Sequence, residues 1–307
     1  MNNLTTNPER TAKLIKTLMD WYRMSRDGPL ENAELPETKP PDGVTRGSYE
    51  HIMFLTLTVA IDYQRSAAKL WDSARKTWED KETRWVFCPK EVADRGLKQL
   101  EAALKKHELS KKQKKDAEIW RKVASSFQSL FQGDPRKLFK KCSFDALEIY
   151  KAMRGRYAKQ FPYLAGATGT SKILSLWIRI LKDEANITFN NLDKVPIPMD
   201  IHTVRATITT GCLVGRFEGT FKELAVQAQE AWMEACRNTE YYPLQLDAPL
   251  WNLGKLGCSK RKKGSVCPEK NKCRLAVYCT ATTSDAKIEL CQNGNTLIDT
   301  KYPERQL

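Results

Sequence analysis

Two segments, GATGTSKILSLWIRIL at residues 166–181 and VPIPMDIHTVR at residues 195–205, decide how this sequence is interpreted. In the first, apolar residues recur at spacings of three and four after Lys172, which predicts an amphipathic helix beginning at this lysine. In the second, two prolines stiffen the approach to Asp200, and a carboxylate at a helix start accepts backbone N–H groups. An amine and a carboxylate at two helix starts indicate a chemical site. An ordinary surface lysine and a simple helix cap are the alternatives.

The composition favours a polyanionic partner. The chain has 307 residues, 41% of them hydrophobic, which suffices for one large or two modest domains. Its formal net charge is +14, so a polyanion is the first partner to consider, either nucleic acid or an anionic membrane surface. A basic protein from a basic proteome is the alternative. The sequence shows neither a long apolar span nor a signal peptide, so we expect an intracellular protein.

Four of the nine cysteines lie within 22 residues and form a candidate metal centre. An odd number of cysteines without an export signal argues against a disulfide framework. The spacing x8, x5, x5 suits a 4Fe–4S cluster or a structural zinc ion. The C-x2-C element common in zinc ribbons is missing, and a proline follows the second cysteine, which favours the cluster. The predicted ligands are Cys258, Cys267, Cys273 and Cys279.

Two basic segments are candidate phosphate contacts. The loop SKRKKGSV between the first two cysteines carries Lys260, Arg261, Lys262 and Lys263, and we expect it to form a positive finger. The run KKHELSKKQKKD at residues 105–116 is interpreted as a solvated loop, with phosphate contact as the alternative.

The remaining periodicity predicts a mainly α fold with a small C-terminal β-hairpin. Asp62 is a candidate N-cap for the helix that follows it. The hairpin is predicted over residues 285–299, around the turn residues Asn293-Gly294. Helices are predicted over residues 5–27, 51–61 (with a strand as the alternative), 90–106, 117–131, 143–153, 172–182 and 220–237, and from Asp200 onward.

Three features occur in one order: a glycine turn with a lysine, a proline-led Asp-x-His helix, and a four-cysteine group. Together they resemble the helix-hairpin-helix DNA glycosylase superfamily, close to endonuclease III, over about residues 48–280. The segment MDIHTVR resembles the family's Val-Asp-x-His-x-x-Arg around its catalytic aspartate, which corresponds to Asp200, with His202 and Arg205 beside it. The helix after the glycine turn resembles the second hairpin helix, whose lysine corresponds to Lys172.

The resemblance also assigns DNA contacts. The hairpin turn at residues 164–171 has one extra residue and lacks the proline of the usual Leu-Pro-Gly-x-Gly-x-Lys motif. The family's cysteine spacing is x6, x2, x5, so the loop here is remodelled. Gln64 is the nearest candidate for the glutamine that fills the vacated base stack. Backbone phosphate is expected to meet the turn residues Gly166, Gly169, Thr170 and Ser171.

The resemblance implies a two-domain helix-hairpin-helix DNA glycosylase fold and a base-excision function. We expect removal of a damaged or mismatched base from double-stranded DNA, with AP lyase activity through a Schiff base on Lys172, whose apolar surroundings would keep it partly deprotonated. The alternatives are a monofunctional glycosylase with Asp200-activated water and a non-catalytic DNA-binding module. We expect a monomer in the cytoplasm, associated with the nucleoid and not with a membrane. The expected parts are an N-terminal helix and arm that pack on the cluster domain at residues 1–47, a helical domain at 48–182, the cluster domain at 183–280 and a hairpin or tail at 281–307.

Overall fold

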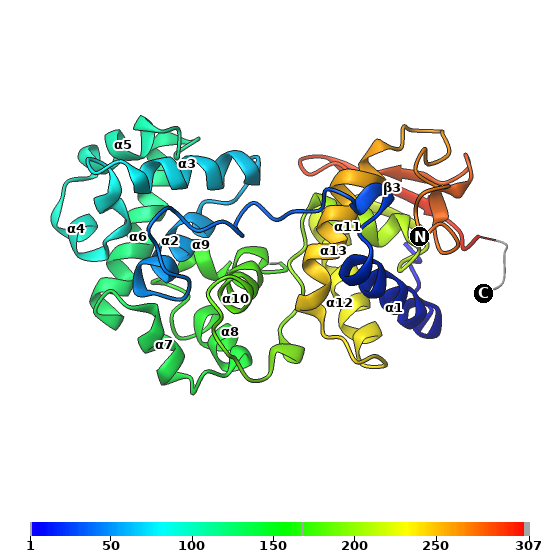
Figure 1. Cartoon of the computed structure of the whole chain (residues 1–307). Helices are drawn as coiled ribbons and strands as arrows, with labels where there is room; N and C mark the ends of the chain where they lie inside the picture. Colours follow the sequence, from blue (N-terminus) through cyan, green and yellow to red (C-terminus); the bar gives the residue numbers. More distant parts are fainter. Residues whose placement is uncertain (1, 167–168, 304–307) are drawn as a thin grey trace. The chain divides into compact units, whose positions relative to one another are not determined.

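Two units, each built mainly of α-helices, make up the chain (Figure 1). Unit 1 combines residues 1–35 with residues 193–307, and unit 2 is the continuous segment 36–192. The computed structural model describes residues 2–166 and 169–303. Within these residues, no helix is both long and apolar enough to cross a membrane.

Unit 2 is organised around α2, because nearly every residue of this helix is buried. Ring contacts lead from Phe54 of α2 to Trp71 and to Phe87, and from Phe87 to Trp120, with ring centroids 5.3–5.9 Å apart. Trp177 of α10 donates its indole N–H to Thr56 Oγ1 at 2.9 Å, which joins α10 to the same core. The helices of unit 2 are α2 (Tyr49–Ala60), α3 (Ala67–Glu79), α4 (Pro89–Asp94), α5 (Leu97–Lys106), α6 (Gln113–Phe131), α7 (Pro135–Lys141), α8 (Ala146–Arg154), α9 (Pro162–Ala165) and α10 (Lys172–Asp183).

Unit 1 is discontinuous in sequence, since α1 packs on α12 and α13 from the other end of the chain. The apolar face of α1, which includes Leu14, Leu18 and Trp21, is buried in the same core as Trp232 of α12. The elements of unit 1 are α1 (Pro8–Met24), α11 (Ile201–Thr209), β1 (Gly215–Thr220), α12 (Phe221–Cys236), α13 (Asp247–Asn252), β2 (Lys287–Glu289) and β3 (Asn295–Thr300). Helix α13 continues into one π-helical turn, Leu253–Gly257.

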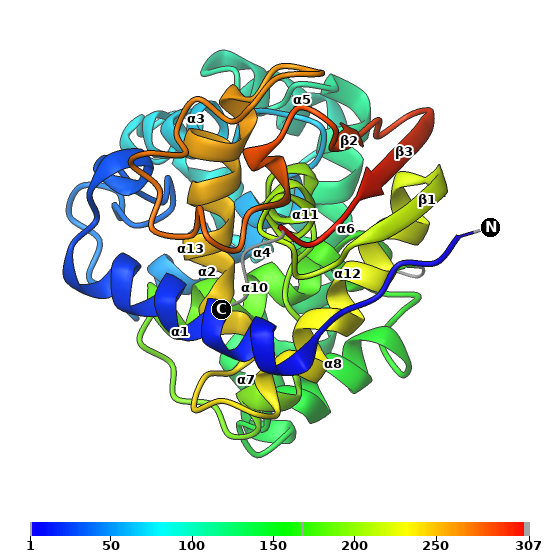
Figure 2. The same ribbon diagram turned by 90° about the vertical axis from the view of Figure 1, so that its right-hand side faces the viewer.

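A three-stranded antiparallel sheet of order β1-β3-β2 completes unit 1 (Figure 2). The predicted C-terminal hairpin is present as β2 and β3. Strand β1 was not predicted, because its apolar content is low and its partner lies about 80 residues further along the chain. Phe217, Ile298 and Ile288 occupy one row across the three strands, and this row packs into the core of unit 1.

The predicted mainly α class is confirmed, and four local predictions need correction. The expected helix at 90–106 is divided into α4 and α5, because Arg95 is extended and Gly96 caps a new helix. Helix α7 was missed. The first helix is shorter than expected and covers Pro8–Met24. Ser66, rather than Asp62, caps α3 by accepting from Lys69 N, so the Asp62 carboxylate does not serve as that cap.

Candidate active site

Asp200 is the N-cap of α11, as the sequence predicts. Its backbone is extended, with φ −120° and ψ −175°, and its Oδ1 accepts from the backbone nitrogens of His202 and Thr203 at 2.8 and 2.9 Å. Backbone N–H groups at a helix start favour a negative charge. The segment therefore delivers an oriented carboxylate at the positive end of α11.

Trp251 supplies a third donor to the same carboxylate, and the sequence analysis missed this residue. Its indole Nε1 donates to Asp200 Oδ2 at 3.1 Å. Helix α13 reaches α11 at this point because Gly254 has no side chain: a Cβ at Gly254 would lie 2.0 Å from the carbonyl oxygen of His202. A glycine three residues after a tryptophan was the available signal, but its meaning depends on the close approach of two helices.

His202 and Arg205 connect the start of α11 to α13 and the turn that follows it. The His202 ring meets Trp251 edge-on, with ring centroids 5.7 Å apart. Arg205 Nη1 lies 3.2 Å from His202 Nδ1 and also donates to the Gly254 carbonyl at 3.4 Å. Burial lowers the pKa of Arg205, while Cys258 and Asp200 oppose this shift. The Asp-x-His-x-x-Arg segment therefore forms one connected arrangement with α13.

Lys172 is the first residue of α10 in unit 2, at the predicted place. Its side chain is 27% exposed. Nζ donates to the Asp62 carbonyl oxygen at 3.2 Å and lies 3.8 Å from the carboxylate Oδ2 of the same residue. The surroundings of Lys172, expected to be apolar, therefore also include a carboxylate.

The glycine turn before α10 contains two left-handed glycines, Gly166 with φ +65° and Gly169 with φ +75°. Ser171 is also left-handed, with φ +49°, and its hydroxyl donates to the Gly166 carbonyl at 3.1 Å. A Cβ at Gly166 would approach Ser171 Cα to 3.2 Å, so Gly166 and Ser171 lie close together across this turn. Of the predicted turn at 164–171, residues 167–168 lie outside the described residues.

Gln64 lies in the loop after α2, and the basic run at 105–116 reaches it. Lys111 Nζ donates to the Gln64 carbonyl oxygen at 2.8 Å, and Lys112 Nζ donates to its side-chain Oε1 at 2.6 Å. Asp116 anchors the run by accepting from the backbone nitrogens of both lysines at 2.7 and 2.8 Å. The run therefore contacts the Gln64 loop. Neither the solvated-loop interpretation nor the phosphate-contact interpretation predicted this contact.

The four predicted metal ligands line one pocket in unit 1, with Leu253, Leu275 and other side chains. Each of the four is a free thiol. Burial, followed by the charges of the other cysteines, raises the pKa of Cys258 well above its ordinary value. Burial also raises the pKa of Cys273 to about 11 and of Cys279 to about 12. Raised pKa values favour the neutral thiols, so these cysteines would become thiolates only beside a positive charge such as that of a bound metal.

Within the residues described, no three His, Cys, Asp or Glu side chains are grouped as ligands of a single metal ion.

The basic loop between the first two cysteines is partly neutralised by its own chain. Lys260 pairs with Glu269 at 2.8 Å and Lys263 pairs with Glu289 at 2.7 Å. Arg261 donates to the Ala286 carbonyl at 2.6 Å. The loop is therefore held against the cysteine segment and the C-terminal sheet, and its Lys262 is also exposed.

Two comparisons with known proteins found likenesses, one in sequence and one in fold. Residues 170–283 match the sequence model of a family, AGOG, described as N-glycosylase/DNA lyase. The matched range contains Lys172, Asp200 and the four clustered cysteines. A search of curated proteins found no match.

The fold is similar to that of endonuclease III in a solved structure titled as a trapped endonuclease III–DNA covalent intermediate, the estranged-adenine complex. The TM-score is 0.50 and the sequence identity is 13%, over 86% of this chain and 96% of that one. This likeness concerns the fold, whereas the family match concerns the sequence that contains the candidate site. Residues 170–283 are thus similar in sequence to an N-glycosylase/DNA lyase family, and the chain is similar in fold to endonuclease III.

Proposed function

We propose that this protein excises a damaged or mismatched base from duplex DNA and then cleaves the strand through a Schiff base on Lys172. The observation that carries the proposal is the position of the Lys172 amine. It is partly exposed, it is held at the start of α10, and it lies within the region that matches an N-glycosylase/DNA lyase family. The proposed substrate is double-stranded DNA, and the proposed acting form is a monomer in the cytoplasm.

The proposed chemistry begins with extrusion of the target nucleotide, because its C1′ atom is inaccessible inside a duplex. The unprotonated Lys172 amine attacks C1′, the N–C1′ bond to the base breaks, and the base leaves with a proton. The sugar ring then opens: the amine's remaining proton moves to O4′ and a C1′=N imine forms. Loss of a C2′ proton expels the 3′ phosphate, which nicks the strand.

Asp200 is proposed to accept the proton that the lysine loses on attack and to pass it to the departing base, and to stabilise the positive charge that develops on the sugar. Its carboxylate accepts three hydrogen bonds, from His202 N, Thr203 N and Trp251 Nε1, so it is oriented before any substrate arrives. A preorganised charge of this kind needs little rearrangement during the reaction.

Cys258, Cys267, Cys273 and Cys279 are proposed to hold a 4Fe–4S cluster, with structural zinc as the alternative. Such a group supplies structural cross-linking of residues 258–279 and takes no part in the bond changes. Lys260, Arg261, Lys262 and Lys263 are proposed to meet DNA phosphate, and breaking the weak exposed ion pairs of this loop costs little.

One observation favours a second function, a monofunctional glycosylase in which Asp200 activates water. The Asp62 carboxylate lies 3.8 Å from Lys172 Nζ, and a nearby negative charge favours the ammonium form, which is not a nucleophile.

The deciding experiment incubates the protein with duplexes containing oxidised pyrimidines, 8-oxoguanine, uracil, hypoxanthine, alkylated bases or mismatches. Base release and strand nicking are scored separately, with and without borohydride. We expect one class to yield a trapped protein–DNA adduct that Lys172→Gln abolishes. Lys182→Gln, at the other end of α10, is the matched control and retains the adduct. Base release without nicking or trapping would establish the monofunctional alternative, and no release from any duplex would contradict both.

A further inference from the structure

Asp62 contacts the Lys172 amine through two different groups. Its main-chain carbonyl accepts from Nζ at 3.2 Å, and its carboxylate lies 3.8 Å from the same nitrogen. The Asp62 side chain is only 9% exposed. Because Asp62 lies two residues after the end of α2, the most buried helix of unit 2, the amine is held beside the core of that unit.

The placement of Lys172 explains why a carboxylate is needed there. Lys172 is the first residue of α10, where the helix dipole is positive and disfavours a cation. The Lys172 side chain is only 27% exposed, and residues 174–181 of the same helix are all buried. Solvent therefore compensates the charge of the amine only partly. A carboxylate at 3.8 Å offsets both effects.

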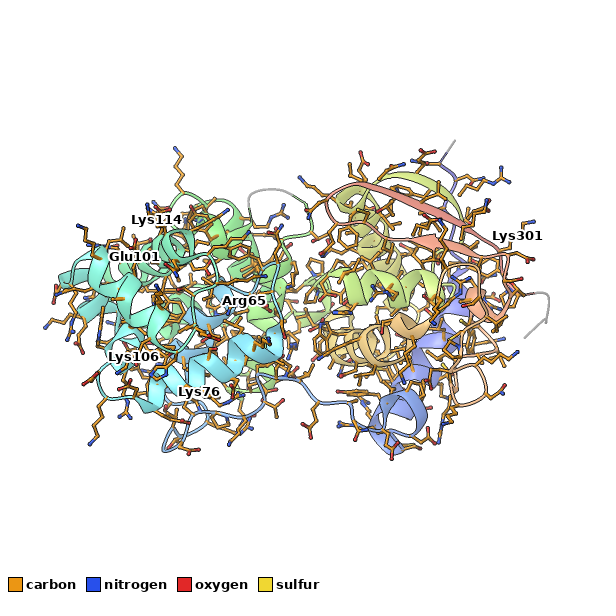
Figure 3. All side chains as sticks on the ribbon, turned by 90° about the horizontal axis from the view of Figure 1, so that it is seen from above. Arg65, Lys76, Glu101, Lys106, Lys114 and Lys301 are labelled. Carbon is orange, nitrogen blue, oxygen red and sulfur yellow. The ribbon has the colours of Figure 1, made fainter. Side chains whose placement is uncertain are left out.

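Arg65, labelled in Figure 3, is a second cation whose charge interacts with that of Asp62. The side chain of Arg65 is 7% exposed, and it lies 3.9 Å from the Asp116 carboxylate. Burial lowers the pKa of Arg65, whereas the charges of Asp116 and Asp62 raise it. Asp62 therefore faces two cations, Lys172 and Arg65, and the second cation favours its ionised form.

We propose that Asp62 is the positioning residue for Lys172: it directs the amine and serves as its counter-ion until DNA is bound. This inference rests on the proposed lyase function of Lys172. Arg65 keeps Asp62 an anion, so Asp62 orients the amine without removing its proton, a step left to Asp200. The charged and titratable groups that surround this arrangement are Asp62, Tyr63 and Arg65 from the loop, Lys112, Lys115 and Asp116 from α6 and the residue before it, Tyr163 from α9, and Lys172.

The test uses a duplex with a preformed abasic site, so that no lesion has to be recognised. The rate of borohydride trapping is measured from mildly acidic to mildly alkaline pH for the wild type and Asp62→Asn. Removing the negative charge moves the midpoint of the profile to lower pH by about one unit. Loss of orientation lowers the maximal rate about tenfold. A profile of Asp62→Asn that coincides with the wild type in midpoint and maximum would overturn the proposal.

Two further variants separate this role from general destabilisation. Asp72→Asn removes a carboxylate from an exposed lysine pair, Lys76–Asp72 at 2.8 Å, and leaves the profile unchanged. Asp62→Glu retains the charge, so it restores the midpoint while the maximal rate stays reduced. A midpoint of Asp62→Glu that follows Asp62→Asn would contradict the counter-ion role. Circular dichroism melting confirms that each variant is folded.

A DNA-free measurement keeps this inference separate from the proposed function. Lysines are reductively methylated with a carbon-13 label, and the Lys172 signal is assigned by its loss in Lys172→Arg. In Asp62→Asn this signal titrates at lower pH than in the wild type. If the wild type forms no trapped adduct, the lyase function fails, while this titration still decides whether Asp62 is the counter-ion. Identical titrations would overturn the inference even if lyase activity is found.

Discussion

The indole N–H of Trp251 and the carboxylate of Asp200 form a hydrogen bond of 3.1 Å between α13 and the start of α11. Asp200 Oδ1 is already occupied by two backbone donors of α11, so Trp251 fixes the orientation of the second oxygen. The helix cap sets where the carboxylate lies, and the tryptophan sets how it is rotated. Its chemistry therefore depends on a residue 51 positions away in sequence.

Replacing Trp251 with phenylalanine tests this dependence, because the ring remains and the donor is lost. We expect base release to fall by about 10- to 150-fold, which corresponds to about 1.5–3 kcal/mol for a hydrogen bond to a charged group. Single-turnover kinetics on the lesion found in the duplex panel would measure it. Trp85→Phe in unit 2 is the control and should leave the rate unchanged, whereas equal losses in both variants would contradict this role of the indole.

Gly254→Ala should destabilise unit 1 strongly. The added Cβ would lie 2.0 Å from the His202 carbonyl oxygen, so α11 and α13 would have to move apart. We expect a loss of about 3 kcal/mol or more in the free energy of unfolding, at the upper end of overpacking effects. Gly96→Ala is the control, since its Cβ would meet nothing within 4 Å. Chemical denaturation measures both, and a loss below about 1 kcal/mol in Gly254→Ala would show that the helices can separate cheaply.

Changing any one of the four clustered cysteines to serine should remove the proposed 4Fe–4S cluster. Iron and acid-labile sulfide, assayed per chain after anaerobic purification, should both fall to background in Cys258→Ser and Cys273→Ser. Cys291→Ser is the matched control, because this exposed thiol does not line the pocket. Finding zinc without iron in the wild type would contradict the proposed cluster and support the structural zinc ion.

His51 should make the protein less stable in mild acid. This fully buried ring accepts from Gly47 N at Nδ1, and burial followed by the charge of Arg46 lowers its pKa from 6.5 to about 4. Between these values the unfolded chain binds more protons, so stability falls as the pH falls from about 6.5 to about 4. The contribution of His51 to this loss is about 3 kcal/mol.

The variant His51→Asn keeps an acceptor near Gly47 N but does not titrate in this range. Urea unfolding at neutral pH and near pH 4 should therefore show a smaller loss of stability in this variant than in the wild type. Equal losses in the two proteins would assign the acid sensitivity to other groups.

The sequence was informative wherever a local pattern determined the structure. The amphipathic spacing after Lys172 and the proline-led Asp200 cap both predicted helix starts that the structure has. Hairpin β2–β3 was predicted from its turn residues. Strand β1 escaped because its pairing with β3 is long-range, and a strand of low hydrophobicity is specified by its partner rather than by its own residues.

The candidate site was predicted as a set of residues but not as a set of contacts. Neither Trp251 beside Asp200 nor Asp62 beside Lys172 can be found by spacing, since 51 and 110 residues separate the partners. Asp62 was expected to cap α3 because aspartate before a helix usually does so. Ser66 is the cap instead, and the Asp62 carboxylate lies near Lys172.

The discontinuous composition of unit 1 has a consequence for synthesis of the chain on the ribosome. Residues 36–192 emerge as one continuous segment and contain a complete core, so unit 2 can fold while translation proceeds. Helix α1 emerges earlier but buries Leu14, Leu18 and Trp21 against α12 and α13, which are translated some 200 residues later. During that interval its apolar face remains without its native cover. Slow translation would therefore expose the nascent chain to aggregation through α1, and chaperone capture of stalled chains should map to this helix.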